Sequence, residues 1–246
     1  MDEQIRSDDQ PRTGVVGRIF GTFFSPGATF ASVCNSSTWV DWVAPLAITA
    51  IIGIVAAQQA GPIAMQEGID RQREKIEQNT ALSEDQKKKS LEGLEKAQTM
   101  GMGKIALVTA PVAALATLAI LAGIYLGIAN FLFRGTGSYL KAMAVTAYAG
   151  LIHSLEAVVL TPLIVMKNTA NIVMGPALFL PQEQQHTWAY RLASGVDLFT
   201  IWYLVVVSIG VGAISGVSSK RVGSVIFPLW LIWVIAMAFV KNAFGG

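Results

Sequence analysis

Five long apolar segments constrain this chain of 246 residues more than any other feature. They cover residues 42–64, 105–133, 142–166, 198–217 and 222–240, and four of them contain no charged residue. At about 1.5 Å of rise per helical residue, each is long enough to cross the hydrocarbon core of a bilayer. Because backbone polar groups must be satisfied internally in lipid, such segments form helices. The sequence therefore predicts an all-α, polytopic membrane protein built on a bundle of five transmembrane helices.

Composition agrees with a membrane protein and excludes several other classes. Hydrophobic residues make up 53% of the chain and charged residues 14%, whereas a soluble domain carries about 25% charged residues. The basic residues are dispersed without an aromatic stripe, so we expect no nucleic-acid partner. A single cysteine, Cys34, excludes disulfide frameworks, cysteine zinc motifs and iron–sulfur ligation. No metal-ligand spacing or catalytic motif is present. We therefore expect no metal, no cofactor and no enzymatic activity.

The segment from residue 13 to residue 38 has the pattern of short amphipathic helices. Apolar residues recur there at steps of three and four: Val16, Ile19, Phe20 and Phe23. Arg18 and Thr22 fall off this apolar face. Trp39 and Trp42 flank the first span, where indole rings favour the headgroup level. The pattern predicts helices lying in the membrane interface. The alternative is a short helix packed against the bundle.

The remaining chain divides into a polar N-terminus and one transmembrane domain. Residues 1–12 are polar and are expected to be disordered, and they lack the apolar core of a signal peptide. Residues 39–246 form the five-helix domain. A loop at 167–191 joins the third and fourth spans. A charged segment at 67–104 joins the first two.

This charged segment holds eight basic and eight acidic residues and is predicted to be a helical hairpin arm outside the membrane. Its two helices break at Asn79, and Ser83 with Gln86 has the pattern of a capping box. Glu84 stands four residues before Lys88, a favourable spacing for an ion pair along a helix. The arm is either a solvated spacer or a surface that binds a partner.

Small residues recur every fourth position in four of the spans. Such stripes allow helix backbones to approach closely, and packing explains them better than a pore lining. The stripes can serve contacts within one chain or between chains, so the sequence is compatible with a homo-oligomer. The residues expected to pack helices in this way are Gly53, Ala57, Gly61, Gly123, Gly127, Gly150, Gly212 and Gly216.

His153 and Glu156 are the most unusual polar residues, because they lie three apart on one helical face near the middle of the third span. An ionisable group at membrane depth is costly and points to function. Thr146 extends this face. Asp197 opens the fourth span, where the helix dipole alone accounts for it. The candidate roles are a proton relay, a lipid-headgroup contact and a hydrogen bond that fixes helix packing.

Several short segments, taken in order, resemble a known family. They are FSPGATF at 24–30, WVAPL at 42–46, GTGSY at 135–139 and DLFTIW at 197–202. Over about residues 18–240 the chain resembles the Ypt-interacting-protein (Yip) domain family in its bacterial form. The resemblance implies five spans, a cytosolic N-terminus and no catalytic residues. Eukaryotic relatives are implied to bind Rab-type GTPases and to act in vesicle formation, machinery that bacterial members lack.

The function expected from these features is a non-enzymatic membrane scaffold or adaptor. It would act on the lipid bilayer and on an unknown protein partner through the segments at 13–38 and 67–104. The alternative is a small transporter, channel or lipid-handling protein that uses His153 and Glu156. Setting the arm aside, Lys and Arg number seven against three in favour of an N-terminus inside. We therefore expect a bacterial inner membrane protein with a cytoplasmic N-terminus.

Overall fold

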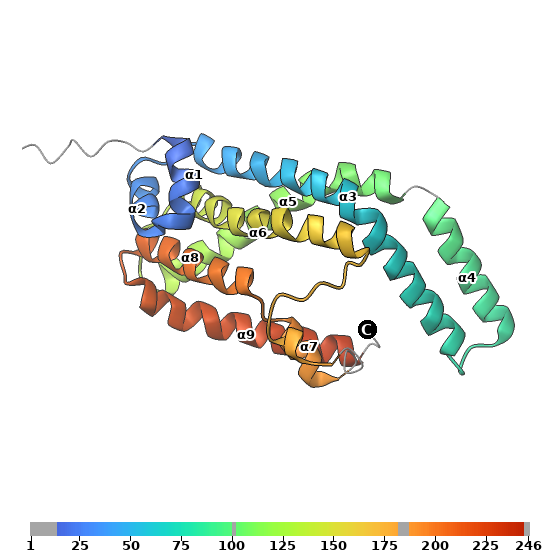
Figure 1. Cartoon of the computed structure of the whole chain (residues 1–246). Helices are drawn as coiled ribbons and strands as arrows, with labels where there is room; N and C mark the ends of the chain where they lie inside the picture. The colour runs from blue at the N-terminus through green and yellow to red at the C-terminus, as the bar shows by residue number, and fades with distance from the viewer. Residues whose placement is uncertain (1–13, 100–101, 182–186, 244–246) are drawn as a thin grey trace, which may run out of the picture. The chain divides into compact units, whose positions relative to one another are not determined.

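The computed structural model describes residues 14–99, 102–181 and 187–243, and within these ranges the chain forms helices and connecting turns without a strand (Figure 1). The polar segment at 1–12, expected to be disordered, lies outside the described residues.

Five long apolar helices confirm the predicted fold class. They are α3 (Val40–Gln78), α5 (Met102–Gly127), α6 (Tyr139–Lys167), α8 (Leu198–Ser215) and α9 (Ser219–Ala243). Each contributes a candidate span, the second of which runs from Pro111 to Leu132, with an 18-residue window whose mean hydropathy lies between 1.8 and 2.3. The chain is thus an all-α, multi-pass membrane protein. Much of the surface of these helices remains exposed, as expected for side chains that meet lipid rather than water.

Shorter helices complete the fold. Two of them, α1 (Val15–Phe24) and α2 (Pro26–Ser36), precede α3, and α4 (Glu84–Thr99) follows it. A 3₁₀ turn at Pro176–Phe179 and the helix α7 (Trp188–Ser194) lie between α6 and α8. Ser25 stands at the N-cap position of α2 with Pro26 as its first residue, an arrangement that costs no backbone hydrogen bond.

The chain forms two compact units, and the boundary between them falls within each of the five long helices. The first unit comprises residues 1–46, 118–151 and 203–229. Its core is built from large side chains that are fully buried, contributed by α2, α6, α8 and α9. They include Phe30, Val33, Val145, Tyr148, Val207, Val211 and Val222. α1 and α2 both belong to this unit.

A compact turn in the first unit connects α5 to α6. α5 ends in a π-helical turn at Ile128–Leu132, and the Asn130 side chain exchanges two hydrogen bonds of 3.0 Å with the backbone of Gly137. Gly135 lies against α8, where an added Cβ would stand 2.8 Å from the Cα of Ser215. The turn therefore needs glycine for space at this position.

The second unit comprises residues 47–117, 152–202 and 230–246 and contains the charged arm. α3 continues without a break to Gln78, and α4 returns after a short turn. The predicted capping box is confirmed. The backbone amide of Gln86 donates to Ser83 Oγ, and the backbone amide of Ser83 donates to Gln86 Oε1 at 3.0 Å. Glu84 pairs with Lys87 at 3.1 Å instead of the expected Lys88, since positions three and four apart are both neighbours on a helix.

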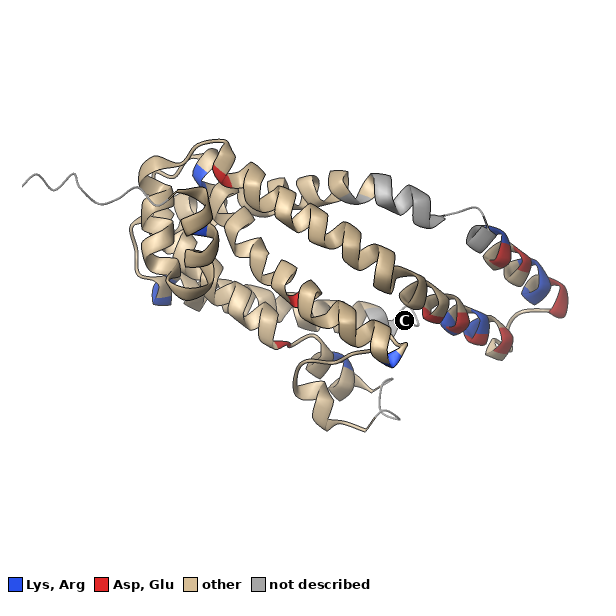
Figure 2. Ribbon diagram, turned by 45° about the horizontal axis from the view of Figure 1, so that its top comes forward, with Lys and Arg blue, Asp and Glu red and all other residues tan. Residues whose placement is uncertain are grey.

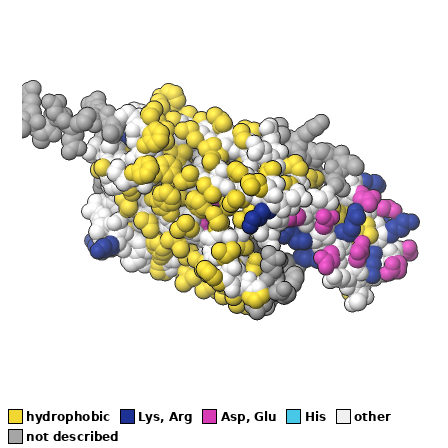
Figure 3. Space-filling view, viewed as in Figure 1, with side chains coloured by type: hydrophobic (Ala, Val, Ile, Leu, Met, Phe, Trp, Pro, Cys, Tyr) yellow, Lys and Arg dark blue, Asp and Glu magenta, His cyan; other side chains and the backbone are white. Residues whose placement is uncertain are grey.

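Charge is distributed unevenly over the described residues. Lys, Arg, Asp and Glu gather on the last turns of α3 and on α4, whereas the other long helices carry few of them (Figure 2). In the view of Figure 3, hydrophobic side chains cover the long helices, and charged side chains crowd the arm. This contrast separates lipid-facing from water-facing segments.

Candidate functional site

His153 and Glu156, singled out from their spacing, contact each other on α6. His153 Nδ1 lies 3.1 Å from Glu156 Oε2, within hydrogen-bonding distance. Their side chains are 43% and 24% exposed, respectively. One turn of helix is enough to bring them together, because residues three apart share a face. The pair can therefore share a proton between an imidazole and a carboxylate.

Glu156 and Asp197 line the same cavity of about 230 Å³ in the second unit, together with residues of the loop that follows α6. Asp197 caps α8: its carboxylate accepts hydrogen bonds from the Thr200 amide at 2.8 Å and from the Thr200 hydroxyl. Thr146 belongs to the first unit, is buried, and donates to the Ala142 carbonyl at 2.7 Å. Glu156 therefore contacts His153 and lines a cavity with Asp197. The Thr146 hydroxyl is hydrogen-bonded within its own helix instead.

Most of the small residues expected to pack helices have open space beside them. Gly212 is the exception, since an added Cβ would meet the Val217 carbonyl at 2.9 Å. Gly216 has a positive φ of 70° and ends α8, a conformation that favours glycine. Apart from chain neighbours and the backbone of the same helix, no atom of the described structure lies within 4 Å of a Cβ added at Gly53, Gly61, Gly123, Gly127 or Gly150. Ala57 is exposed. Their role in helix packing stays a prediction.

The four residues expected at the membrane interface divide by exposure. Phe20 and Trp39 are 62% and 65% exposed, whereas Phe23 and Trp42 are half-buried. Val16 and Phe24 are also exposed, so α1 turns apolar side chains outward. The position of α1 in the membrane interface stays a prediction.

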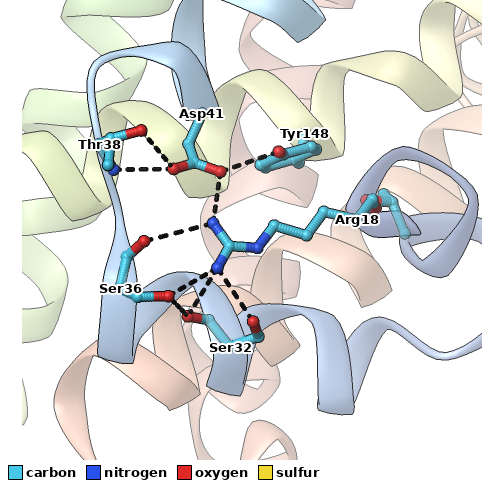
Figure 4. A network of polar contacts seen from close by, with 7 residues as sticks. Arg18, Ser32, Ser36, Thr38, Asp41 and Tyr148 are labelled. Atoms are coloured by element: carbon cyan, nitrogen blue, oxygen red, sulfur yellow. Dashed lines mark hydrogen bonds and ion pairs between the residues drawn. The ribbon is translucent and has the colours of Figure 1, made fainter. Parts of the chain in front are cut away.

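The polar face of α1 points inward, and Arg18 on this face is only 5% exposed. Its guanidinium forms an ion pair of 2.5 Å with Asp41, which is 1% exposed and lies at the start of α3. The second terminal nitrogen donates to Ser36 Oγ at 2.7 Å and to Ser32 Oγ at 3.0 Å on α2 (Figure 4). One cation therefore ties α1 to both α2 and α3.

Asp41 completes this cluster from the other side. Its Oδ1 accepts a hydrogen bond of 3.0 Å from the Tyr148 hydroxyl of α6, as Figure 4 shows. Its Oδ2 accepts from the Thr38 amide at 2.7 Å and from the Thr38 hydroxyl at 3.1 Å. A buried carboxylate with four donors is well compensated, as a charge in a low-dielectric setting must be. We call Arg18, Asp41, Tyr148 and their serine and threonine partners the Arg18 cluster.

Sequence reasoning missed the Arg18 cluster because it placed Arg18 off the apolar face of its helix and assigned it no partner. One signal was present: Arg18 and Asp41 carry opposite charges and are flanked by apolar residues on both sides. Neither charge could remain in an apolar setting without a partner.

Cys34 lies near the cluster on α2 and is half-buried. Burial raises the pKa of its thiol, an effect that the positive charge of Lys141 partly opposes. Within the described ranges, no group of three or more His, Cys, Asp and Glu side chains lies close enough to hold a metal ion.

Comparison with known proteins gives one match. The model of a protein family described as the Yip1 domain matches residues 20–240, nearly the whole chain. No curated protein and no solved structure gives a significant match.

Proposed function

Because this chain belongs to the Yip1 domain family of membrane proteins, we propose that it works as a non-enzymatic membrane scaffold that organises the bilayer through α1 and recruits partners through its arm. The orientation of α1 is the observation that carries this proposal. α1 holds its cation inward in the Arg18 cluster and turns Val16, Phe20 and Phe24 outward.

An outward apolar face on a short helix supports insertion into the membrane interface. A water-soluble surface helix does the reverse, with apolar residues inside and charges outside. Transfer of exposed phenylalanine side chains from water to the boundary between headgroups and acyl chains lowers the free energy. A helix held at a fixed place on a multi-pass protein then adds area to one leaflet, which favours curvature.

The arm supports the second part of the proposal. Its helices carry balanced charge, and Arg73 of α3 pairs with Glu95 of α4 at 3.6 Å across the hairpin. Such pairs contribute little stability, and the surface they leave is water-exposed and highly charged. A protein partner would meet this surface through complementary charge.

The depth of α1 can be measured directly. In a Cys34→Ser background, a nitroxide attached at Phe20→Cys is compared with one attached at Ser90→Cys on the arm, with the protein in nanodiscs. We expect the label at residue 20 to relax faster with oxygen, which partitions into lipid, than with a water-soluble nickel complex. The label at residue 90 should show the opposite preference. A label at residue 20 that prefers the nickel complex would contradict the interfacial position.

The scaffold activity itself is tested on liposome shape. Wild-type protein should shift reconstituted liposomes toward smaller diameters, and Phe20→Gln with Phe24→Gln should remove that shift. The matched control, Phe131→Gln with Phe179→Gln, removes two exposed phenylalanines outside α1. Equal effects of the two double variants on liposome diameter would contradict the proposed role of α1.

The contact of His153 with Glu156 favours a second candidate, a proton-linked transporter or lipid-handling protein. The imidazole and carboxylate are 3.1 Å apart, and Glu156 lines a cavity. Proton flux into liposomes should then fall in Glu156→Gln and persist when the arm is deleted. Unchanged flux in Glu156→Gln excludes this candidate, whereas partner loss on deletion of the arm supports the scaffold.

The proposed location is the bacterial inner membrane, with the N-terminus in the cytoplasm. The orientation rests on the distribution of Lys and Arg outside the arm.

A further inference from the structure

Two turns of the first unit pack together and bring basic side chains to one place. The turn between α5 and α6 lies against the end of α8, where a Cβ added to Gly137 would collide with the Ile214 side chain. A second short turn leads from α8 into α9. The two turns and the helix starts that follow them carry four cations, which we call the basic surface: Arg134, Lys141, Lys220 and Arg221.

Arg221 connects the two turns directly. Its guanidinium carbon lies 5.8 Å from the centre of the Phe133 ring, which is the distance of a cation–π contact. Phe133 immediately precedes Arg134, so the contact brings basic residues of both turns to the same part of the unit. Both arginines are exposed. Because like charges repel each other at short range, this arrangement favours a bound anion.

The described part of the first unit offers these cations no free acidic partner. In its residues 14–46, 118–151 and 203–229, the only carboxylate side chain is that of Asp41. Asp41 is 1% exposed and pairs with Arg18 inside the Arg18 cluster. The basic surface therefore presents positive charge that this described part of the unit does not neutralise.

Arg134 has a backbone conformation that suits glycine better than arginine. Its φ is 56°, in the left-handed region that residues with a Cβ rarely adopt. Other residues hold the turn: the Gly135 amide donates to the Ala129 carbonyl at 2.9 Å, and Asn130 exchanges two hydrogen bonds with Gly137. Glycine at position 134 would thus fit the turn with less strain. A strained residue that the turn does not require points to a role for its side chain in binding.

The basic surface lies at the level of lipid headgroups. The candidate span Pro111–Leu132 ends two residues before Arg134, and the candidate span Ser219–Val240 begins one residue before Lys220. Basic side chains at the ends of a span lie near the boundary between hydrocarbon and water. The phosphates of phospholipids occupy the same level. Arginine matches phosphate oxygens in geometry as well as in charge.

We infer that the basic surface binds the headgroups of anionic phospholipids, such as phosphatidylglycerol. Arg134 and Arg221 bind phosphate oxygens, and Lys141 and Lys220 add positive charge around them. Clusters of Lys and Arg next to membrane-spanning helices are a recurrent form of lipid recognition. A zwitterionic lipid carries an ammonium group that these cations repel, so the surface favours lipids with a net negative charge. The basic surface uses no residue of α1 or of the arm, so it stands or falls separately from the proposed function.

Native mass spectrometry of the full chain tests the inference. The protein is extracted from liposomes that contain equal amounts of phosphatidylglycerol, phosphatidylethanolamine and phosphatidylcholine, and the retained lipids are identified. Wild type should retain phosphatidylglycerol in preference. Arg134→Gly and Arg221→Gln should each retain roughly fivefold less, which is the effect of one basic residue near an anionic membrane surface. The double variant should retain roughly 25-fold less if the two effects are independent.

Arg134→Gly separates lipid binding from folding. Because glycine adopts a positive φ without strain, the melting temperature of this variant in detergent should equal or exceed that of wild type while its lipid retention falls. The matched control is Lys167→Gln, which removes an exposed cation at the other end of α6. This control should retain phosphatidylglycerol as wild type does.

Four outcomes overturn the inference. Wild type shows no preference among the three lipids, Arg134→Gly retains as much phosphatidylglycerol as wild type, or Lys167→Gln loses as much as Arg134→Gly. The fourth outcome concerns residues 2–12, which include four acidic and two basic residues. Retention of phosphatidylglycerol that begins only when these residues are deleted would assign the basic surface to that segment of the chain instead of to a lipid.

Discussion

At the scale of single residues, Arg18 and Asp41 show how strongly an apolar environment couples two charges. Each side chain is almost completely buried, and each is the main counter-charge of the other. A buried ion pair contributes modestly compared with an apolar replacement, but removal of one partner leaves an uncompensated charge. The pair therefore matters more for which conformation α1 adopts than for total stability.

Asp41→Ala should destabilise the protein by about 3–5 kcal/mol, because the Arg18 guanidinium loses its counter-charge inside the first unit. Asp41→Ala combined with Arg18→Met removes both charges and should recover most of the loss. Thermal unfolding in detergent measures both variants against wild type, with Glu92→Ala on the arm as the control that should leave the melting temperature unchanged. An unaltered melting temperature in Asp41→Ala would mean that the ion pair does not hold α1 in place.

Cys34 provides a pH-dependent prediction at the same scale. The thiolate is the reactive form, and burial raises the pKa of this thiol above its ordinary value. Cys34 should therefore react with a maleimide more slowly at pH 8 than a cysteine at Ala31, an exposed position on the same helix, tested in a Cys34→Ser background. The pH at which the rate reaches half its maximum should also lie higher for Cys34. Coincident rate profiles for the two cysteines would contradict this prediction.

At the scale of elements, the sequence pattern predicted those features that depend only on residues close together in the chain. The capping box at Ser83, the break after Gln78 and the contact of His153 with Glu156 all follow from helical periodicity. The orientation of α1 could not be predicted in this way. Arg18 and Thr22 fall on the polar side of a helical wheel, and only the partners on α2, α3 and α6 make that side the buried one. Tyr148 lies 107 positions from Asp41, a distance that no local pattern reports.

Gly135 and Gly123 differ in the space that surrounds them, so alanine at the two positions should have different effects on stability. Gly135→Ala should destabilise the protein by about 1–3 kcal/mol, since its Cβ would stand 2.8 Å from the Ser215 Cα. Gly123→Ala should be neutral or stabilising by up to about 1 kcal/mol, because α5 leaves open space there and alanine favours helix. Thermal unfolding compares the two. Destabilisation by Gly123→Ala, together with a change in oligomeric state on size-exclusion chromatography, would instead show that this stripe packs against a second chain.

At the scale of the whole molecule, five spans fix which segments share a side of the membrane. One crossing by α3 would put α1 and the arm on opposite sides of the membrane. The count of Lys and Arg outside the arm favours the proposed cytoplasmic position of α1, whereas the eight basic residues of the arm oppose it. The charge balance of the arm does not remove this objection, because the rule counts Lys and Arg rather than net charge.

Cysteine accessibility decides the orientation. Single cysteines at Ser90 on the arm and at Ala31 on α2, each in a Cys34→Ser background, are labelled in intact bacterial cells with a membrane-impermeant maleimide. We expect the cysteine at residue 90 to react in intact cells and the cysteine at residue 31 to react only after the inner membrane is permeabilised. Labelling at residue 31 alone would reverse the orientation and place α1 in the outer leaflet. Labelling of both before permeabilisation would mean that α3 does not cross the membrane, which would contradict the five-span fold itself.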